Sequence, residues 1–381
     1  MLRMYIQFLQ NHCEVVYNGY MKIGIYNPYL DTMSGGEKYM LTAASYLSAK
    51  NDVTLFWDDP KILDKAQKKL NIDLKKVSVK PNIFYLKTSV LSKLLQTVNY
   101  DRLIILSDGS IPLTLAKKTF LHFQYPVEWV GLDLKTKLKL MKIDRIICNS
   151  FFTKKFIDKK FGLESIVLYP PCIRESEVDE ILKSKIEKEK KNILLTVGRY
   201  AAANGSSIKK QEIMIKVFKQ MVDKGLRNSE FIIATSFLQE NERSIQEIEA
   251  SVRKYPIKIV KNASYEELKK LYSDAKIYWH ATGFGEDIEK YPERAEHFGI
   301  TTVEAMAHKT VPIVYAAGGQ AEIVDDGVNG FLWQTEEELA QKTKKLMLDE
   351  KLRIEIGNLG FKKAQLFTTE KFCEQLEEII R

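Results

Sequence analysis

Two glutamates and the residues between them provide the clearest chemical signal in this chain. Glu296 and Glu304 have seven residues between them, and the surrounding pattern predicts a loop that leads into a helix. Glu296 is expected on the loop and Glu304 about one turn inside the helix. The first N–H groups of a helix lack intrahelical acceptors and carry partial positive charge, so they can bind phosphate oxygens. One carboxylate could therefore meet a sugar ahead of a diphosphate, while the other meets nucleoside hydroxyls behind it.

Small residues around this expected helix start favour a close approach of a ligand to the backbone. Thr301 or Thr302 is expected to cap the helix. Gly299 lets the backbone come close to a phosphate, and Gly318-Gly319 is expected to offer a second set of exposed N–H groups. Together these residues predict a diphosphate-binding site that needs no cation.

The order of short segments in this stretch is typical of a known family. In sequence they are Glu296, His297-Phe298-Gly299-Ile300, Glu304-Ala305-Met306-Ala307, Gly318-Gly319 and Asn329-Gly330-Phe331. This order resembles the signature of the family 4 retaining glycosyltransferases, also called glycosyl transferases group 1. The Glu-His-Phe-Gly-Ile form is similar to the branch that includes the Alg11-type mannosyltransferases. The resemblance covers most of residues 21–381.

The resemblance implies an α/β protein with the GT-B fold, in which two Rossmann-like doubly wound domains enclose a cleft. It implies a retaining hexosyltransferase with a nucleotide-diphosphate sugar as donor, either GDP-mannose or a UDP-hexose, and a glycan or lipid-linked acceptor. Front-face attack, which needs no covalent protein nucleophile, is the implied reaction. The alternatives are a catalytically inactive nucleotide-sugar-binding subunit and another GT-B enzyme, such as a sugar-nucleotide epimerase.

The resemblance also implies roles for single residues. An arginine and a lysine of the second domain are expected against the diphosphate, and an insertion at 201–208 leaves the lysine open between Lys209, the better match, and Lys210. A histidine at the end of a predicted strand is expected near the donor sugar and acceptor. The expected catalytic residues are His122, Arg199, Lys209 and Glu296. The expected donor-binding residues are Gly35, Gly36, Phe298, Gly299, Ile300, Thr301, Glu304, Gly318 and Gly319.

The first half of the chain contains a glycine pair but lacks the glycine pattern of a dinucleotide-binding enzyme. Ser34-Gly35-Gly36-Glu37 lies between a predicted strand and a predicted helix. It resembles the Gly-Gly loop of the family, whose amides face the cleft. Dinucleotide binding at such a place requires Gly-x-Gly-x-x-Gly, which is absent here, so the sequence disfavours a dehydrogenase.

The sequence predicts chemistry without a metal or a cofactor. No Asp-x-Asp occurs in the chain. Arg199, Lys209 and the expected helix start would stabilise the charge of a leaving diphosphate instead. The four cysteines show no paired spacing, which argues against a disulfide framework or a metal centre.

Alternating strand and helix patterns position these residues. The predicted strands are 23–26, 53–57, 102–106, 119–123, 145–149 and 166–169, and then 193–197, 231–234, 257–260, 277–280, 311–315 and 330–333. Predicted helices include 37–49, 175–191 and 370–381. This alternation implies parallel sheets with right-handed crossovers.

A length of 381 residues favours two domains. Residues 1–20 are an extension with no predicted role. Residues 21–171 are expected to form the acceptor-side domain and 172–369 the donor-binding domain. The final helix, 370–381, is expected to pack back on the first domain.

Charge is distributed unevenly between the two halves. Residues 1–170 contain 25 Lys and Arg against 15 Asp and Glu, a net charge of +10, whereas the remainder carries a net −2. The basic half fits either an anionic membrane surface or phosphate-bearing acceptor, or an ordinary solvated surface; Lys135, Lys139 and Lys142 are expected on one helical face. No nucleic-acid-binding motif accompanies the charge. No apolar run approaches the length of a membrane span, so we expect a cytoplasmic protein, which would be peripheral at the membrane if its basic half meets lipid.

Overall fold

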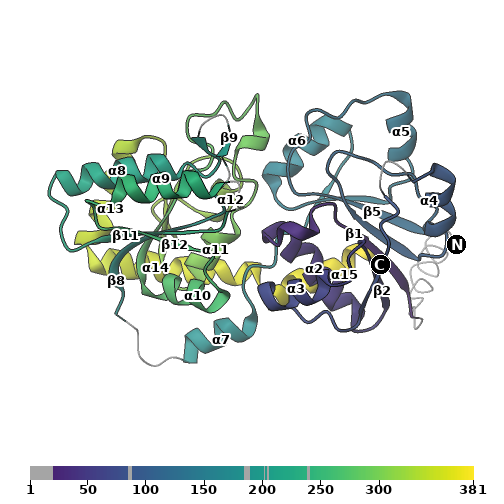
Figure 1. Cartoon of the computed structure of the whole chain (residues 1–381), viewed down its shortest axis with the longest axis horizontal. Helices are drawn as coiled ribbons and strands as arrows, with labels where there is room; N and C mark the ends of the chain where they lie inside the picture. The colour runs from purple at the N-terminus through teal and green to yellow at the C-terminus, as the bar shows by residue number, and fades with distance from the viewer. Residues whose placement is uncertain (1–19, 85–87, 184–188, 201, 204–205, 238–240) are drawn as a thin grey trace, which may run out of the picture.

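A computed structural model describes residues 20–84, 88–183, 189–200, 202–203, 206–237 and 241–381. In these residues the chain forms two α/β domains that lie side by side along the long axis of the molecule (Figure 1). The predicted fold class, two doubly wound parallel α/β domains, is confirmed. Residues 1–19 of the N-terminal extension lie outside the described part.

The first domain contains a seven-stranded parallel sheet with the order β3-β2-β1-β4-β5-β6-β7. Its strands are β1 (Lys22–Tyr26), β2 (Asp52–Phe56), β3 (Val77–Lys80), β4 (Arg102–Leu106), β5 (Lys118–Phe123), β6 (Arg145–Cys148) and β7 (Ile166–Val167). Its helices are α2 (Gly35–Ser48), α3 (Ile62–Leu70), α4 (Val90–Thr97), α5 (Leu134–Leu140) and α6 (Phe151–Phe161). Every residue of the central strand β4 is buried, as expected for a parallel strand covered on both faces.

The second domain contains a six-stranded parallel sheet with the order β12-β11-β8-β13-β14-β15. Its strands are β8 (Lys191–Val197), β11 (Glu230–Thr235), β12 (Ile257–Lys261), β13 (Ala275–His280), β14 (Val311–Tyr315) and β15 (Phe331–Trp333). Its helices are α7 (Glu175–Lys183), α8 (Gln211–Asp223), α9 (Glu242–Val252), α10 (Tyr265–Asp274), α11 (Ile300–Ala307), α12 (Gln320–Ile323), α13 (Glu336–Leu348) and α14 (Glu350–Ala364). A small antiparallel ribbon, β9 (Ala202–Ala203) with β10 (Ser206–Ser207), precedes α8.

Both sheets reverse their strand order at an internal point, between β1 and β4 in the first and between β8 and β13 in the second. In doubly wound sheets, ligands bind at such points, beside the carboxyl ends of the strands. The fold therefore directs attention to the loops that follow β8, β13 and β14.

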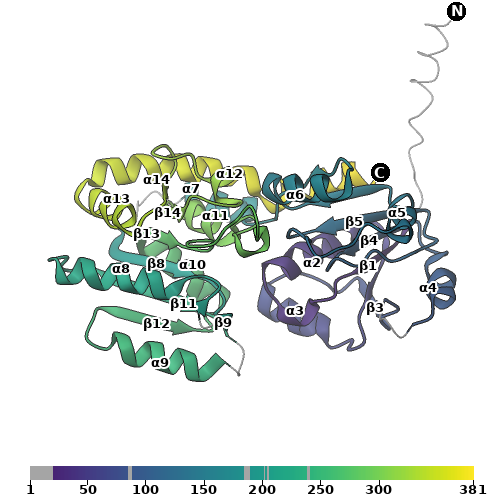
Figure 2. The same ribbon diagram turned by 90° about the horizontal axis from the view of Figure 1, so that it is seen from above.

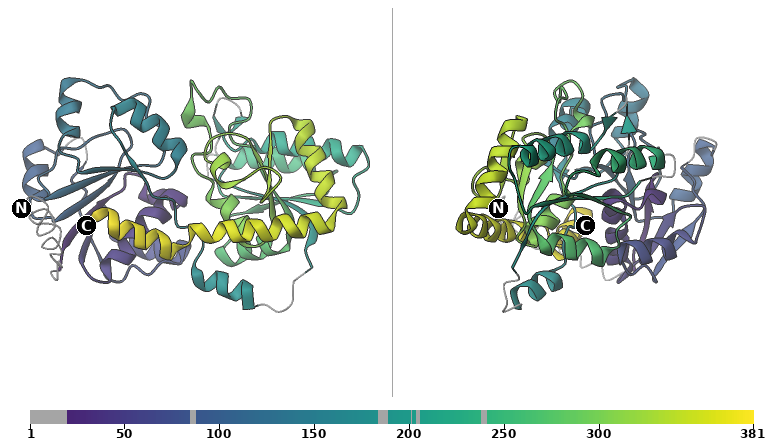
Figure 3. Two further views of the ribbon diagram at one scale, coloured as in Figure 1. Left: turned by 180° about the vertical axis from the view of Figure 1, so that it is seen from behind. Right: turned by 60° about the vertical axis from the view of Figure 1, so that its left-hand side comes forward.

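Two chain segments pass between the domains and pair with each other. The Cys172 N–H donates to the Phe367 carbonyl at 3.0 Å, and the Thr369 N–H donates to the Ile173 carbonyl at 2.8 Å. The last helix, α15 (Thr369–Ile380), then crosses to the first domain, as Figures 2 and 3 show. Its position is fixed by Arg102 of β4, whose guanidinium donates to the carbonyls of the last two residues at 2.8 and 2.9 Å.

The structure differs from the predicted elements in a few places. The helix predicted over 37–49 begins earlier, at Gly35, because Ser34 and Glu37 form a capping box in which the Glu37 carboxylate accepts from the Ser34 N–H at 2.7 Å. The helix predicted over 175–191 is described only as far as Lys183, and β8 already begins at Lys191. Strand β3 and the β9–β10 ribbon were not predicted. None of the described helices is both long and apolar enough to cross a bilayer.

Candidate active site

The candidate site centres on Glu296, in the loop before α11. Its Oε2 accepts from Lys209 Nζ at 2.6 Å and lies 2.7 Å from His280 Nε2. Its side chain is only 16% exposed. Burial alone would raise the pKa of Glu296, but the charge of Lys209 and the hydrogen bond from His280 outweigh it and hold the pKa well below its usual range. Glu296 is therefore a carboxylate at any physiological pH.

His280 is the last residue of β13 and forms a hydrogen bond with the Glu296 carboxylate. The histidine is 3% exposed, and burial lowers its pKa despite the neighbouring carboxylate, so its ring is neutral. A neutral imidazole whose Nε2 faces a carboxylate carries its proton there and donates it. His280 thus orients Glu296 without cancelling its charge. The sequence places His280 only at a strand end, and nothing in its local pattern identifies this contact.

The Gly318-Gly319 turn holds the Glu296 loop in place. The Gly319 N–H donates to the Glu296 carbonyl at 2.7 Å. A Cβ at Gly318 would lie 2.2 Å from the Glu296 carbonyl oxygen, and one at Gly319 would lie 2.4 Å from Phe298 Cα. Both positions therefore need glycine for close packing. The expected second set of exposed N–H groups is wrong for Gly319, because its amide is used inside the protein.

Helix α11 begins differently from the prediction. Its N-cap is Gly299, with φ +118°, and no side chain caps the helix. Thr301 Oγ1 instead lies 2.7 Å from the Tyr278 hydroxyl, and the Thr302 hydroxyl is buried without a partner. The predicted threonine cap is thus wrong. The Thr302 N–H donates to the Gly299 carbonyl at 3.0 Å, but no side chain caps the helix, so the N–H groups of Ile300 and Thr301 can meet a ligand. Such a helix start suits an anion better than a capped end would.

Glu304 lies one turn inside α11 and joins the two domains. Its Oε2 accepts from the Tyr272 hydroxyl at 3.0 Å, and its Oε1 pairs with Lys38 Nζ at 3.4 Å. Lys38 comes from α2 of the first domain and also donates to the Cys172 carbonyl at 3.1 Å. This lysine was not predicted as a site residue. Its only signal in the sequence is its place two residues after the Gly-Gly pair.

The first-domain glycines lie directly against this helix start. A Cβ at Gly35 would meet Ile300 Cδ1 at 2.7 Å, and one at Gly36 would meet Gln124 Oε1 at 2.3 Å. Gln124 Nε2 in turn donates to the Gly36 carbonyl at 3.1 Å. A larger residue at Gly35 would push the first domain away from α11, whereas one at Gly36 would displace Gln124 within the first domain. The structure thus brings Gly35 and Ile300 together.

The two adjacent lysines of the second domain have different partners. Lys209 pairs with Glu296, and its aliphatic carbons cross Gly198, where a Cβ would lie 3.3 Å from Lys209 Cγ. Lys210 pairs instead with Glu286 at 2.6 Å. Lys209 is therefore the lysine that belongs to the Glu296 cluster. Arg199, which follows β8, is exposed.

Two other predicted residues lie in packed surroundings. His122 is 1% exposed; its ring stacks on Tyr39 at 4.2 Å, and its Nδ1 lies 3.1 Å from the Ile147 carbonyl. Burial lowers the pKa of His122 to about 3. Among the described residues, no hydrogen bond connects it to Glu296. The Phe298 ring is also buried, 5.4 Å from Tyr169, so this residue can meet a ligand only through its backbone.

Hydrogen bonds between the domains also form at the other end of the Gly-Gly turn. Glu322 of α12 accepts from the N–H groups of Phe151 and Phe152, at 2.9 and 2.5 Å, and from the Tyr169 hydroxyl at 3.2 Å. The Glu322 carboxylate thus lies at the N-terminus of α6, where the helix dipole favours a negative charge. Glu322 and Lys38 thus both connect the two domains beside the site.

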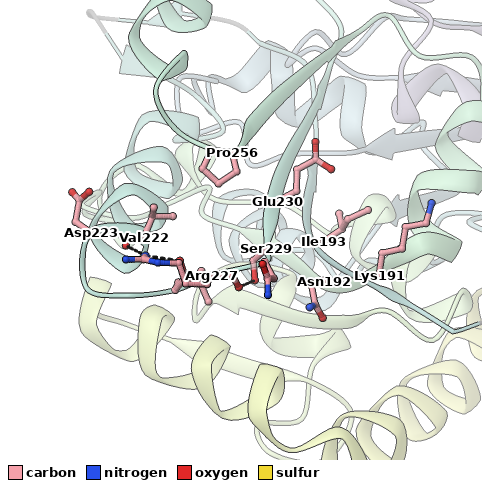
Figure 4. Close-up of a pocket in the computed structure, with 11 residues that line it drawn as sticks. Lys191, Asn192, Ile193, Val222, Asp223, Arg227, Ser229, Glu230 and Pro256 are labelled. Carbon is pink, nitrogen blue, oxygen red and sulfur yellow. Dashed lines mark hydrogen bonds between the residues drawn. The ribbon is translucent and has the colours of Figure 1, made fainter.

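A surface hollow elsewhere in the second domain is not a candidate for catalysis. Figure 4 shows its lining, which includes Lys191, Glu230 and Pro256. These residues lie at or just before the amino ends of β8, β11 and β12. Functional groups in a parallel sheet gather at the carboxyl ends. Within the described residues, no group of three or more His, Cys, Asp or Glu side chains could hold a metal ion.

The sequence is similar to those of two known mannosyltransferases. The chain is 24% identical over 276 residues to human alpha-1,3/1,6-mannosyltransferase ALG2, and the aligned region covers 67% of this chain and 61% of that protein. It is also 24% identical over 276 residues to the GDP-Man:Man(3)GlcNAc(2)-PP-Dol alpha-1,2-mannosyltransferase of Neurospora crassa, covering 62% of this chain and 46% of that protein. The chain therefore spans less than two thirds of the length of either relative.

Solved structures share the fold over nearly the whole chain. HepE of Anabaena in complex with UDP superimposes with a TM-score of 0.70 at 15% identity, covering 94% of this chain and 99% of HepE. The glycosyltransferase WaaG gives a TM-score of 0.59 at 13% identity, covering 94% of this chain and 99% of WaaG. The two domains thus form a GT-B fold. Residues 177–363, which include both glutamates, match the family model for glycosyl transferases group 1.

Proposed function

We propose that this chain is a retaining hexosyltransferase that uses a nucleotide-diphosphate sugar and a glycan or lipid-linked acceptor. The observation that carries the proposal is the contact between Glu296 and Lys209 beside the uncapped start of α11. A carboxylate, an ammonium group and open helix N–H groups there match the hydroxyls of a sugar and the charge of a diphosphate. The family of residues 177–363 and the names of the relatives support the same reaction.

Stabilisation of the leaving diphosphate is the main task of the site. As the glycosidic bond breaks, positive charge develops on the sugar and negative charge on the diphosphate. The open N–H groups of α11, Lys209 and the exposed guanidinium of Arg199 would stabilise that negative charge. Fixed dipoles and charges of this kind need little reorganisation during the reaction, which is why they lower the barrier effectively.

The two glutamates would bind different parts of the donor. Glu296 is ionised and oriented by His280, so it can accept hydrogen bonds from sugar hydroxyls and stabilise an oxocarbenium-like sugar. Glu304 lies farther along α11 and would accept hydrogen bonds from the ribose. To do so it must exchange its present contact with Lys38 at 3.4 Å, a long and therefore weak ion pair.

The donor base and sugar have support from two directions. The name of the Neurospora crassa relative specifies GDP-mannose as its donor. Structures of HepE contain UDP, UDP-glucose, or UDP with glucose. We favour GDP-mannose, because the two relatives compared above are mannosyltransferases by name.

A donor screen tests the proposal. The full chain would be heated with GDP-mannose, UDP-glucose, UDP-N-acetylglucosamine, GDP and UDP, and its melting temperature compared with that of the free chain. We expect one nucleotide family to raise the melting temperature, and its sugar donor to be slowly hydrolysed without an acceptor. Binding without any hydrolysis or transfer would favour the inactive-subunit alternative. The absence of stabilisation by every compound would refute a nucleotide-sugar site.

A further inference from the structure

An exposed surface of the first domain combines apolar and basic side chains in a way that its core does not require. Helices α4 and α5 lie at the end of this domain away from the second domain (Figures 1 and 2). Here α4 includes the flanking Val98, and α5 the flanking Met141 and Lys142. We call these two helices with their flanking residues the α4–α5 surface.

On α5, the apolar residues face two ways. Leu140 is buried in the core of the first domain, which accounts for the attachment of the helix. Leu134, Leu138 and Met141 instead are 74%, 57% and 79% exposed. Their spacing of i, i+4 and i+7 places them on one face of the helix. Among the described residues, this second apolar face takes no part in the hydrophobic core.

Helix α4 repeats the same arrangement. Leu91, Leu95 and Val98 are 66%, 61% and 47% exposed and have the same i, i+4 and i+7 spacing. Its inward side is formed by the fully buried Thr97, which donates to the Lys93 carbonyl at 2.8 Å. Two neighbouring helices thus each present three large apolar side chains to water. A single exposed leucine is ordinary, but two ordered rows mark a surface that meets an apolar partner.

The charges on the same surface are almost all positive. Lys135 and Lys139 flank the exposed apolar row of α5, with Lys137 and Lys142 close in sequence. Lys93 of α4 lies near enough to α5 that burial and the charge of Lys139 lower its pKa. Neither Val90–Thr97 nor Leu134–Leu140 contains an acidic residue; Asp133 precedes α5 and caps it by accepting from the Thr136 N–H at 2.7 Å.

We propose that the α4–α5 surface binds the headgroup region of an anionic lipid bilayer. Apolar side chains would enter the boundary between headgroups and acyl chains, while the lysines would remain with the lipid phosphates. A protein partner with an apolar groove would explain the leucines, but it would not need a surface whose charges are almost all positive. This inference concerns the first domain alone, and it holds whether or not the chain transfers a sugar.

Flotation of the full chain with vesicles tests the proposal. Vesicles of phosphatidylcholine alone would be compared with vesicles that also contain phosphatidylglycerol. We expect binding to the anionic vesicles only. The double variant Leu95→Ser/Leu138→Ser should lower partitioning by on the order of tenfold or more. The double variant Lys135→Ser/Lys139→Ser should lower it by about fivefold for each lysine, and added salt should reproduce that loss.

Controls distinguish lipid binding by this surface from non-specific adsorption to vesicles and from dimerisation. Leu348→Ser removes a leucine that is 76% exposed on the second domain and should leave partitioning unchanged. The leucine variants change exposed residues, and neither Lys135 nor Lys139 is buried, so the melting temperatures of all variants should match that of the wild-type chain. Equal binding to both kinds of vesicle, or no effect of the leucine variant, would overturn the proposal. So would light scattering that shows a dimer which Leu95→Ser/Leu138→Ser dissociates, because a second copy would then cover the surface.

Discussion

The substitution Glu296→Gln tests the centre of the site most directly. In the free protein, the carboxylate accepts from Lys209 at 2.6 Å and from His280 at 2.7 Å. A glutamine has nearly the same shape and keeps one acceptor oxygen, so it can still accept from His280. It loses the negative charge that attracts Lys209 and that would stabilise a positively charged sugar.

The size of the effect follows from the kind of hydrogen bond that is lost. A hydrogen bond to a charged group contributes about 1.5–3 kcal/mol, which corresponds to about tenfold to 150-fold. If Glu296 acts mainly in the transition state, this loss should appear in kcat, while KM for the donor changes little. Lys209 keeps its own charge and is released from its partner. The affinity for GDP or UDP should therefore remain the same or rise.

Two companion variants make the result specific. Glu304→Gln should weaken nucleoside diphosphate binding by roughly tenfold, because its carboxylate is expected on the ribose. Glu336→Gln is the matched control: Glu336 also pairs with a lysine, Lys216 at 2.9 Å, but on α13 of the same domain rather than in the loop before α11. It should change neither quantity.

Calorimetric titration with GDP and UDP, beside steady-state rates, provides the measurements. If Glu296→Gln lost diphosphate affinity and Glu304→Gln kept it, the two assignments would be reversed. If Glu296→Gln had normal turnover, the carboxylate that the structure places against Lys209 would have no catalytic role, and the reasoning above would fail.

Three further predictions follow from the charges and the buried groups. Activity should persist in excess EDTA, because the helix start and basic side chains would stabilise the leaving group; a strict need for added Mg²⁺ or Mn²⁺ in rate measurements would contradict this. Burial lowers the pKa of His122 to about 3, whereas a histidine in the unfolded chain titrates near 6.5. Between these two pH values only the unfolded state binds the proton. The free energy of unfolding should therefore fall as pH drops from about 6.5 toward 3, by up to about 1.4 kcal/mol per pH unit. His122→Phe, which keeps a ring against Tyr39, should flatten that slope in urea titrations, and an unchanged slope would show that His122 is not its source. Glu322→Ala removes the acceptor of the Phe151 and Phe152 N–H groups and should loosen the domains, increasing the radius of gyration in small-angle scattering without nucleotide; an unchanged radius would show that other contacts hold them.

Local patterns in the sequence carried most of the fold. Runs such as residues 102–106 and 311–315 are rich in Leu, Ile and Val, and the strands β4 and β14 have these same bounds. Strand β3 escaped prediction because it is only four residues long, Val77–Lys80, and only Val77 is buried at this edge of the sheet. Edge strands carry a weaker pattern because only one neighbour and one face constrain them.

The two glutamates could also be predicted without the structure, because they belong to one short sequence motif. The residues that contact them could not be predicted. Lys209 is 87 residues from Glu296, and Lys38 is 266 residues from Glu304. Contacts over such separations depend on strand order and on the way the domains meet, and neither leaves a periodic signal in the chain.

The sequence by itself thus determined two parallel α/β domains, the loop with its paired glutamates and a basic first half. The tertiary structure decided which lysine meets Glu296, that Gly299 rather than a threonine precedes α11, and that the Gly319 amide is used internally. It also showed that the lysines of α5 share their surface with two rows of exposed apolar residues. The physical reason is the same in each case: periodicity specifies which way a side chain faces on its own element, but only packing between elements specifies what it meets.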